Sequence, residues 1–479
     1  MKSRHFIPLL IMLFLNPFLL SQERFRKYPP NPEPLPSLKL PEIESWTLSN
    51  GLEISVIRLT KIPVISLQLI IFSGESTSPD SLPGLATITS KMLNRGSLNL
   101  SFSEIEKTID LIGGEFSVQT FPDYTVFSLF FLEEYLDTSL ELLSQMLLQP
   151  TFPRQEIENV KRNMFYDLAR KKNNPEYAGK KLLYQILFKD HTYRKIFFND
   201  AIIKKYSLKN IQMFFNKFYC PNNAHLVLVG NLSLSTASRK VSSYLNTWKK
   251  QNIEIYHFPP PKPLEKTKIC FINIPGLKDA LIFSGSSLPP KTDPEYFSLI
   301  VLNQVLGGTP MNRLFMNLRE SKGFAYWAFS EMEFYKSCGI FYIRARVRPD
   351  VIHSSVLESL NEIRRISAQR IPGHEIEQAK SYLIGNFPLA IQRYDELASR
   401  LSEIKALNLN EGHWNNYYEN IMYIDSQIVF KSAYNNLLHP PIIVIVGDQD
   451  NIIDELLKFK TVEVYNNSGE YLHQLTKEQ

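Results

Sequence analysis

The stretch PGLATITSKMLNRG, residues 83–96, decides how the rest of the chain is interpreted. Its apolar side chains recur at helical spacing, and they are Leu85, Ile88 and Met92. This period predicts a helix with one buried stripe. Three polar residues of the same stretch share a second face, being spaced i, i+3 and i+4, and they are Thr87, Ser90 and Lys91.

The second face of this helix has the spacing of a metal site without the ligands of one. A His-x-x-Glu-His pattern at these positions would hold zinc and activate a water molecule. Thr87, Ser90 and Lys91 occupy the three positions instead, and the second half of the chain has no such pattern either. The sequence therefore predicts no metal in this chain. The plainer interpretation, a solvated helix face, leads to the same expectation.

Length and composition describe an ordinary globular protein. The 479 residues exceed what one core holds, so two or more domains are expected. The net charge of +5 is small, and no basic run with interleaved aromatic residues predicts nucleic-acid binding. Three cysteines, Cys220, Cys270 and Cys338, allow one disulfide or none. They are too scattered for a zinc cluster, and buried unpaired thiols are the favoured interpretation.

The N-terminus has the pattern of an export signal. In residues 1–21, Lys2 and Arg4 precede an apolar stretch, Phe6–Leu20, that is short for a membrane-spanning helix. The cleavage site is poor, so an uncleaved N-terminal anchor is the alternative, and membrane contact is expected only in that case. Residues 22–44 are proline-rich and predict an extended tether.

In the remainder of the chain, one pattern of segments occurs twice. The segment ALIFSGSSLP resembles VISLQLIIFSG, and IIVIVGDQD resembles LVLVGNLS, with Gly230 and Gly447 separated by 217 residues. A second proline-rich linker, residues 249–267, lies between the two copies. We therefore expect two similar α+β sandwich domains, 45–248 and 268–479, each an antiparallel sheet packed with helices. Helices are predicted over 83–96, 103–112, 132–148, 154–172, 351–366 and 374–389.

These segments together resemble the insulinase, pitrilysin and mitochondrial-processing-peptidase family of zinc metallopeptidases, from about Trp46 to Val464. Six segments carry the resemblance in order, namely NGLEISVIRLTKIPVISLQLIIFSGES, PGLATITSKMLNRGS, GGEFSVQTFPDYTVFSLFF, FKDHTYRKIFFND, FYCPNNAHLVLVGNLS and LNQVLGGTPMNRLFMNLRESKGFAYWAFS. The resemblance implies a fold of two homologous metallopeptidase-type sandwich domains.

The resemblance places the family's zinc residues on positions that have changed. The two zinc histidines correspond to Thr87 and Lys91, and the glutamate general base corresponds to Ser90. The third ligand corresponds to Asp167, and a supporting glutamate corresponds to Val160. A lone aspartate does not hold zinc against water, and a lysine ammonium repels a dication.

The resemblance also implies a second set of functional residues that this chain retains. In NLRESKGFAY, Arg319 and Tyr326 match the pair that, in active members, faces the zinc, where the tyrosine holds the scissile carbonyl and its oxyanion and the arginine orients it. A phenol and a guanidinium donate hydrogen bonds to developing negative charge. The alternative is structural: Arg319 satisfies a helix C-terminus and Tyr326 is half-buried in a strand.

Other positions that correspond to the family pattern are weaker. Ser117 and Val118 take the place of an Asn-Ala pair that contacts substrate along an edge strand. Gly307-Gly308 with Asn312-Arg313 resembles a glycine-rich loop, or else ends a helix. His191 is interpreted as structural.

The resemblance thus implies a non-catalytic subunit of an exported heterodimeric zinc endopeptidase. A partner with an intact His-x-x-Glu-His motif would supply zinc, this chain would hold no cofactor, and peptides or unfolded segments would be the substrates. Two alternatives remain: a scaffold or binding protein without proteolysis, and an independent peptidase with another metal site.

Overall fold

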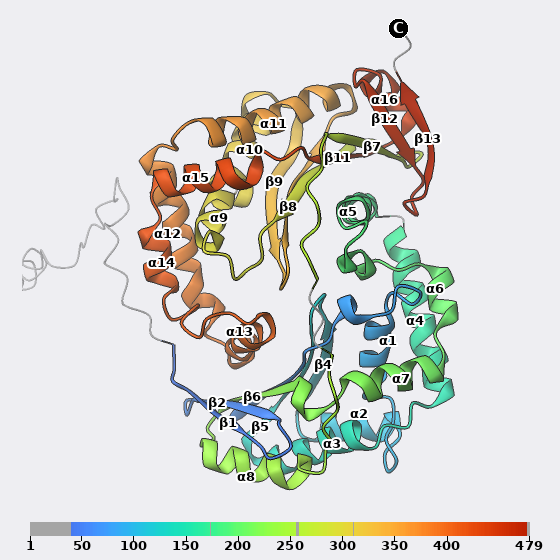
Figure 1. Ribbon diagram of the computed structural model, residues 1–479, viewed down its shortest axis with the longest axis vertical. Coiled ribbons are helices and arrows are strands. Elements are labelled where there is room, and N and C mark those ends of the chain that lie inside the picture. The colour runs from blue at the N-terminus through green and yellow to red at the C-terminus, as the bar shows by residue number, and fades with distance from the viewer. Residues whose placement is uncertain (1–39, 173, 255–257, 310, 477–479) are drawn as a thin grey trace, which may run out of the picture. The chain divides into compact units, whose positions relative to one another are not determined.

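Two sheets, each flanked by helices, form the part of the chain that the computed structural model describes (Figure 1). The described residues are 40–172, 174–254, 258–309 and 311–476. The predicted signal segment 1–21 and most of the tether 22–44 lie outside them. Within the described ranges, no helix is both long enough and apolar enough to cross a membrane.

The first sheet has the strand order β1-β2-β6-β3-β5-β4, so β4 lies at its edge. Its strands are β1 (Ile43–Thr47), β2 (Glu53–Arg58), β3 (Val64–Ile71), β4 (Glu115–Thr120), β5 (Thr125–Leu132) and β6 (Ala224–Gly230). All neighbours are antiparallel except β2 and β6, which are parallel. The turn at Asn50-Gly51 joins β1 to β2 as a hairpin, and Gly51 adopts a φ of +84° there.

The second sheet has the order β13-β12-β7-β11-β8-β10-β9, so β9 lies at its edge. Its strands are β7 (Lys268–Asn273), β8 (Ala280–Leu288), β9 (Ala325–Phe334), β10 (Gly339–Val347), β11 (Ile442–Gly447), β12 (Thr461–Tyr465) and β13 (Tyr471–Thr476). β11 lies between β7 and β8, as β6 lies between β2 and β3, which confirms the predicted internal repeat. The sheets are mixed and not wholly antiparallel, because β6 and β11 return after long helical segments and join parallel to β2 and β7.

The helices of the first half are α1 (Leu85–Lys91), α2 (Phe102–Leu111), α3 (Leu136–Leu148), α4 (Arg154–Lys172), α5 (Pro175–Leu187), α6 (Asp200–Lys205), α7 (Leu208–Phe218) and α8 (Leu234–Leu245). Those of the second half are α9 (Tyr296–Asn303), α10 (Arg313–Phe315), α11 (Ile352–Ala368), α12 (Gly373–Ala390), α13 (Tyr394–Leu407), α14 (Tyr417–Tyr423), α15 (Ser426–Leu437) and α16 (Gln449–Leu456).

Shorter turns of helix complete the fold. The 3₁₀ turns are η1 (Glu75–Thr77), η2 (Glu133–Tyr135), η3 (Thr192–Ile196), η4 (Pro221–Asn223) and η7 (Pro349–Val351). Two π-helical turns, η5 (Gln304–Gly308) and η6 (Met316–Ser321), follow α9 and α10. The predicted helix over residues 83–96 is shortened to α1, which begins after Gly84, with its φ of +84°, and ends before Met92.

Each half of the chain contributes one helix to the sheet of the other half. The helix α5 packs on β8 and β11 of the second sheet, and α13 packs on β3 and β6 of the first sheet. Val227 and Val229 of β6 are buried with Leu397 and Leu401 of α13, which gives the first sheet a second core on its other face. The strands β3 and β6 are therefore buried on both faces.

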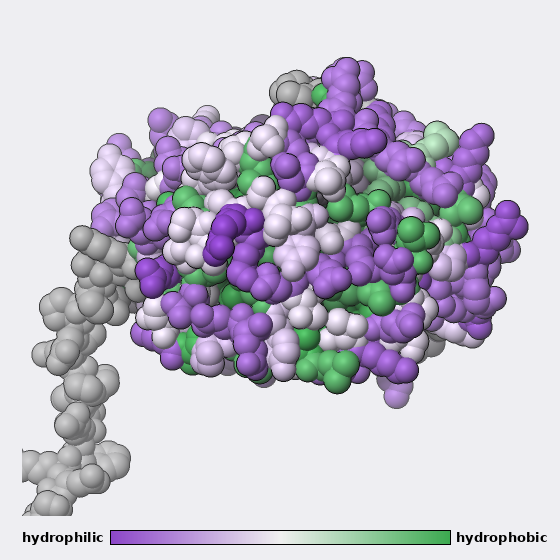
Figure 2. Space-filling model, turned by 90° about the horizontal axis from the view of Figure 1, so that it is seen from below, coloured by the Kyte–Doolittle hydropathy of each residue, from purple (hydrophilic) through white to green (hydrophobic). Residues whose placement is uncertain are grey.

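On the face of the molecule seen in Figure 2, hydrophilic and hydrophobic residues are interleaved.

The three cysteines lie in the interior as free thiols, which confirms the favoured interpretation of unpaired residues. Burial raises the pKa of the Cys220 thiol to about 11 and that of the Cys270 and Cys338 thiols to about 12. These thiols are therefore poor nucleophiles and poor metal ligands at neutral pH.

Candidate functional site

The first turn of α1 is held by the buried carboxylate of Glu75, which lies ten residues before the helix begins. Glu75 is 3% exposed and accepts hydrogen bonds from the backbone nitrogens of Gly84 and Thr87, at 2.9 and 2.8 Å. It also accepts from the hydroxyls of Thr87 and Ser78. Burial raises the pKa of the Glu75 carboxyl, and these hydrogen bonds oppose that effect. Since Gly84 provides no side-chain cap, Glu75 satisfies donors that the helix start leaves free.

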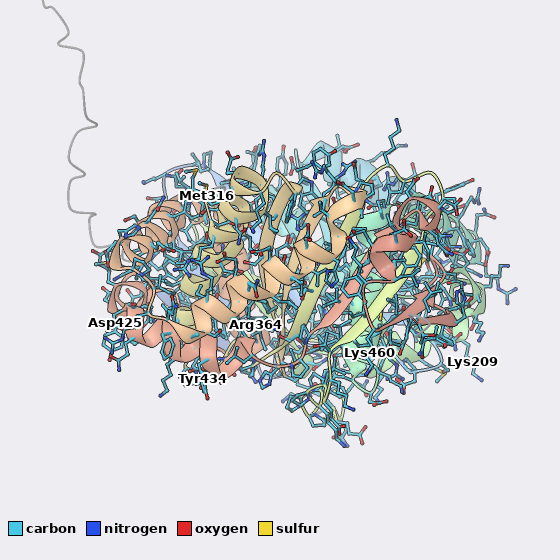
Figure 3. The ribbon with its side chains drawn as sticks, turned by 90° about the horizontal axis from the view of Figure 1, so that it is seen from above. Lys209, Met316, Arg364, Asp425, Tyr434 and Lys460 are labelled. Atoms are coloured by element: carbon cyan, nitrogen blue, oxygen red, sulfur yellow. The ribbon has the colours of Figure 1, made fainter. Side chains whose placement is uncertain are left out.

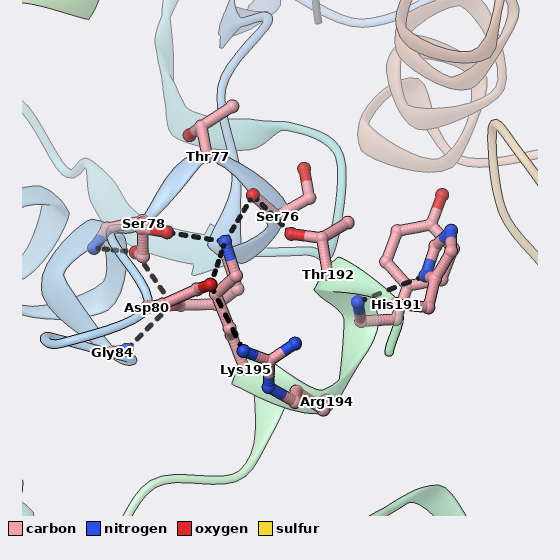
Figure 4. Close-up of polar contacts among 12 residues, drawn as sticks. Ser76, Thr77, Ser78, Asp80, Gly84, His191, Thr192, Arg194 and Lys195 are labelled. Atoms are coloured by element: carbon pink, nitrogen blue, oxygen red, sulfur yellow. Dashed lines mark hydrogen bonds and ion pairs between the residues drawn. The ribbon is translucent and has the colours of Figure 1, made fainter. Parts of the chain in front are cut away.

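A buried lysine fixes the loop between η1 and α1 (Figure 4). The Lys195 ammonium donates to the carbonyls of Ser76 and Ser78, at 3.0 and 2.6 Å, and pairs with Asp80 at 3.2 Å. Burial lowers the pKa of Lys195, and Asp80 opposes this change. Because all three ammonium protons have acceptors, we assign Lys195 a structural role.

Three of the four positions that correspond to the family's zinc site, Thr87, Ser90 and Asp167, are engaged in structural contacts. The Ser90 hydroxyl lies 2.8 Å from that of Thr120 on β4 and 2.9 Å from the Thr87 carbonyl, and Ser90 is buried. Asp167 lies on the exposed face of α4 and pairs with Arg170 at 3.1 Å. The idea that all three positions on α1 form a solvated face is therefore wrong for Ser90, while Lys91 and Thr87 are half-buried.

Zinc does not fit these residues. They offer no imidazole or thiolate, the Thr87 hydroxyl is committed to Glu75, and the one carboxylate, Asp167, is committed to an arginine. Among the residues that the structure describes, no group of three His, Cys, Asp or Glu side chains is arranged to hold a metal ion.

The predicted substrate strand is at a sheet edge. Ser117 and Val118 lie in β4, whose only ladder partner among the described strands is β5. Ser117 is exposed and Val118 packs partly against the core. The outer backbone groups of β4 are thus available to pair with an added strand.

Arg319 lies near the end of η6 and makes only local contacts in the described structure. Its guanidinium carbon is 4.8 Å from the centre of the Phe315 ring, and its Nε is 3.8 Å from Glu320. The Gly323 nitrogen donates to the Arg319 carbonyl at 3.0 Å, and Gly323 has a φ of +62°. Gly323 therefore ends the helical segment before β9.

Tyr326 is the unpaired residue of a β-bulge at the start of β9. Arg346 of β10 pairs with Trp327 and Val347 pairs with Ala325, so the ladder passes over Tyr326. Its side chain is 53% exposed, and its hydroxyl has no hydrogen-bond partner among the described residues. A bulge redirects a side chain from its regular alternation, and bulges are frequent beside active sites.

A second arginine, not Arg319, faces the Tyr326 ring. The Arg346 guanidinium carbon lies 6.0 Å from the ring centre. Asp279, just before β8, accepts hydrogen bonds from Arg346 Nε and Nη2 at 2.9 and 2.6 Å. Arg346 and Asp279 also line a pocket of about 380 Å³ that is completed by Arg170 and the first turn of α5.

The glycine-rich segment before Arg319 ends a helix and adjoins a pocket. Gly307 and Gly308 belong to η5, and the Asn312 side chain caps α10 by accepting from the Phe315 nitrogen at 2.8 Å. Arg313 forms two hydrogen bonds with Glu375 of α12, at 2.7 and 3.1 Å. The pocket between this segment, α11 and α12 has a volume of about 1030 Å³ and a mixed charged lining.

Sequence reasoning missed Glu75, Arg346 and Asp279. Glu75 acts on a helix that begins later in the chain, and Arg346 reaches Tyr326 only because β10 pairs with β9. The alternation of arginines at 344 and 346 on β10, continued by Arg348 just beyond its end, is the one sequence signal that could have drawn attention to Arg346.

Comparisons with known proteins agree with this architecture. A family model described as "Insulinase (Peptidase family M16)" matches residues 56–201, and one described as "Peptidase M16 inactive domain" matches residues 205–383. The crystal structure of a peptidase M16 inactive domain from Pseudomonas fluorescens superposes with a TM-score of 0.79 at 22% identity. It covers 85% of this chain and 98% of that chain.

Two relatives differ in what their names say about activity. The Bacillus subtilis protein "Uncharacterized zinc protease YmxG" is 22% identical over 365 residues, 75% of this chain and 87% of the relative. The Helicobacter pylori "Non-peptidase homolog YmxG" is 24% identical over 351 residues, 71% of this chain and 78% of the relative. Since the two family models follow one another along the chain and the fold matches, the chain belongs to the insulinase family of peptidases, in a form whose zinc-motif positions carry other residues.

Proposed function

We propose that this chain is the non-catalytic, substrate-binding subunit of a heterodimeric zinc endopeptidase. One contrast supports the proposal. On α1, Thr87 and Ser90 occupy positions of the family's zinc motif and form structural hydrogen bonds. Tyr326, in contrast, is exposed on a bulge, and its hydroxyl has no hydrogen-bond partner in the described structure. A partner with an intact His-x-x-Glu-His motif would supply the zinc and the general base.

In this proposal the chain contributes binding and charge stabilisation. A peptide adds as a strand along the edge of β4, where main-chain hydrogen bonds give affinity and Ser117 and Val118 contact it. The Tyr326 hydroxyl donates to the carbonyl oxygen under attack, and the Arg319 guanidinium orients it. Such donors are most effective in a chamber from which water is excluded, and a closed chamber admits peptides and unfolded segments only.

The proposal includes export and assembly. The export signal predicted for residues 1–21 would direct the chain out of the cytoplasm, to the periplasm or beyond. There, two chains of similar size would close around the peptide, one carrying the metal and the other Tyr326. If the N-terminal segment stays attached, the complex is tethered to the membrane.

Co-expression with a His-x-x-Glu-His family member encoded beside this chain tests the proposal. We expect hydrolysis of unfolded peptides by the mixture only. Tyr326→Phe should lower kcat by roughly 10²-fold, as the loss of one oxyanion donor does. Tyr434→Phe is the matched control, since Tyr434 is 60% exposed on α15 and no role is assigned to it (Figure 3).

Two results would count against shared catalysis. An inert mixture, or full activity with Tyr326→Phe, would favour the alternative of a scaffold or binding protein, to which the name of the Helicobacter pylori relative lends support. Stoichiometric zinc in the purified chain alone would instead indicate an independent peptidase with another metal site.

A further inference from the structure

The ring of Tyr326 needs a restraint that its own strand does not supply. At the bulge, Tyr326 pairs with no residue of β10, and about half of its side chain is exposed. A tyrosine in such a position samples several rotamers unless a neighbour limits them. The oxyanion role proposed above needs the hydroxyl to be held in place before substrate arrives, because preorganised donors cost no reorganisation during the reaction.

Arg346 is placed to supply this restraint. Its guanidinium carbon lies 6.0 Å from the centre of the Tyr326 ring, at the outer limit of a cation–π contact. The guanidinium is itself fixed, since Asp279 accepts from both Nε and Nη2, and the Asp279 side chain is only 17% exposed. Both hydrogen bonds go to one carboxylate oxygen, Asp279 Oδ2, and together they limit the orientation of the planar guanidinium more than a single bond to a lysine ammonium would.

Arg319 does not take this position. Its guanidinium lies over Phe315, on its own helical segment, and no contact with the Tyr326 ring links the two within the described structure. The positive charge beside Tyr326 therefore comes from β10.

We propose that Arg346, held by Asp279, is a positioning residue for Tyr326: it fixes the phenol ring, and with it the hydroxyl, in one orientation. This inference rests on the function proposed above for Tyr326. It also assigns a role to the bulge, which brings the ring up to the neighbouring strand's arginine.

A double-mutant cycle in the active mixture tests the coupling. Arg346→Met should lower kcat by roughly fivefold to tenfold with little change in KM, because the contact acts on the donor's position. In the Tyr326→Phe background the same substitution should have no further effect on kcat, since the hydroxyl it positions is gone. Asp279→Asn should reproduce part of the loss.

Arg348→Met is the matched control. Arg348 lies just beyond the end of β10, has the same side-chain exposure of 48% as Arg346, and pairs with Asp350 rather than facing Tyr326. It should leave kcat unchanged in both backgrounds. If Arg346→Met lowers kcat equally with and without the Tyr326 hydroxyl, Arg346 acts on stability or binding and the inference is wrong.

A spectroscopic measurement on the full-length chain separates this inference from the proposed function. The chain is labelled with 3-fluorotyrosine, and the fluorine signal of position 326 is assigned by its loss in Tyr326→Phe. Arg346→Met should shift and sharpen that signal, and Arg348→Met should not. An inert mixture with a shifted signal refutes shared catalysis and leaves the contact intact. An unchanged signal refutes the positioning role whatever the activity.

Discussion

The surroundings of His191 disfavour the protonated form of its imidazole. Its Nδ1 accepts from the Tyr193 nitrogen at 3.2 Å, and its Nε2 lies 3.3 Å from the Ser337 hydroxyl. Burial lowers the pKa of His191 to about 4, and the nearby Lys195 ammonium acts in the same direction. These contacts support the structural role expected for His191 and give the folded state a specific pH dependence.

The free energy of unfolding should fall as the pH is lowered from about 6.5 to 4. In that window the unfolded chain binds a proton at His191 and the folded chain does not, so protonation favours unfolding. His191→Asn keeps an acceptor for the Tyr193 nitrogen but removes the titration. The difference in unfolding free energy between wild type and variant, measured in urea at pH 7 and pH 4.5, should therefore shrink at the lower pH.

His413, whose pKa is also lowered to about 4 by burial, remains in both proteins and leaves part of the acid sensitivity in each. His374→Asn, on the exposed start of α12, is the control for the substitution itself. Parallel curves for wild type and His191→Asn would show that His191 does not contribute to the acid loss of stability.

At the scale of single elements, some features could be predicted from the sequence and others could not. The helix predicted over residues 154–172 matches α4. Its apolar residues at helical spacing, Ile157, Val160, Met164 and Leu168, are the buried ones, because an amphipathic period indicates directly which face packs. The capping of α1 by Glu75 could not be predicted, since η1 meets that helix only in the folded chain. The bulge at Tyr326 is likewise a property of the pair of strands.

The turn η5 makes a close approach to β9 that tolerates only glycine. A Cβ on Gly307 would lie 2.1 Å from the Ser330 nitrogen. Gly307→Ala should therefore push η5 off β9 and lower the free energy of unfolding by about 1–3 kcal/mol. Urea denaturation followed by circular dichroism measures this change.

Gly385→Ala in α12 is a control: it is the same substitution, but the expected change in the free energy of unfolding has the opposite sign. A Cβ there would meet no atom within 4 Å. Gly385→Ala should raise the free energy of unfolding by about 0.5–1 kcal/mol, through the lower entropy of the unfolded chain. Equal effects of the two substitutions would contradict the close contact at Gly307.

For the whole molecule, the repeat in the sequence predicted two similar sheets but not the exchange of helices between them. An apolar stripe shows that α13 packs on a sheet without showing which one. Gln68 of β3 makes the pairing specific, since its side chain donates to Ser399 and accepts from Ser402 of α13, at 3.0 and 2.7 Å. If α13 were shifted along β3, the buried Gln68 amide would lose these hydrogen bonds, and an unpaired buried amide is costly. The pair of bonds therefore fixes the position of α13 on the sheet.

The exchange of helices predicts that neither half of the chain folds without the other. A fragment of residues 1–262 lacks α13 and exposes the outer face of the first sheet, which carries Ile57, Ile70, Val126, Val227 and Val229. It also presents α5 without the second sheet that buries Leu182 and Leu183. Exposed patches of this kind cause aggregation, so each fragment alone should aggregate or bind an apolar dye. Co-expression of 1–262 with 263–479 should restore a soluble complex with one cooperative melting transition, because the cut falls among exposed linker residues. A fragment that melts cooperatively as a monomer would show that its sheet is stable without the exchanged helix.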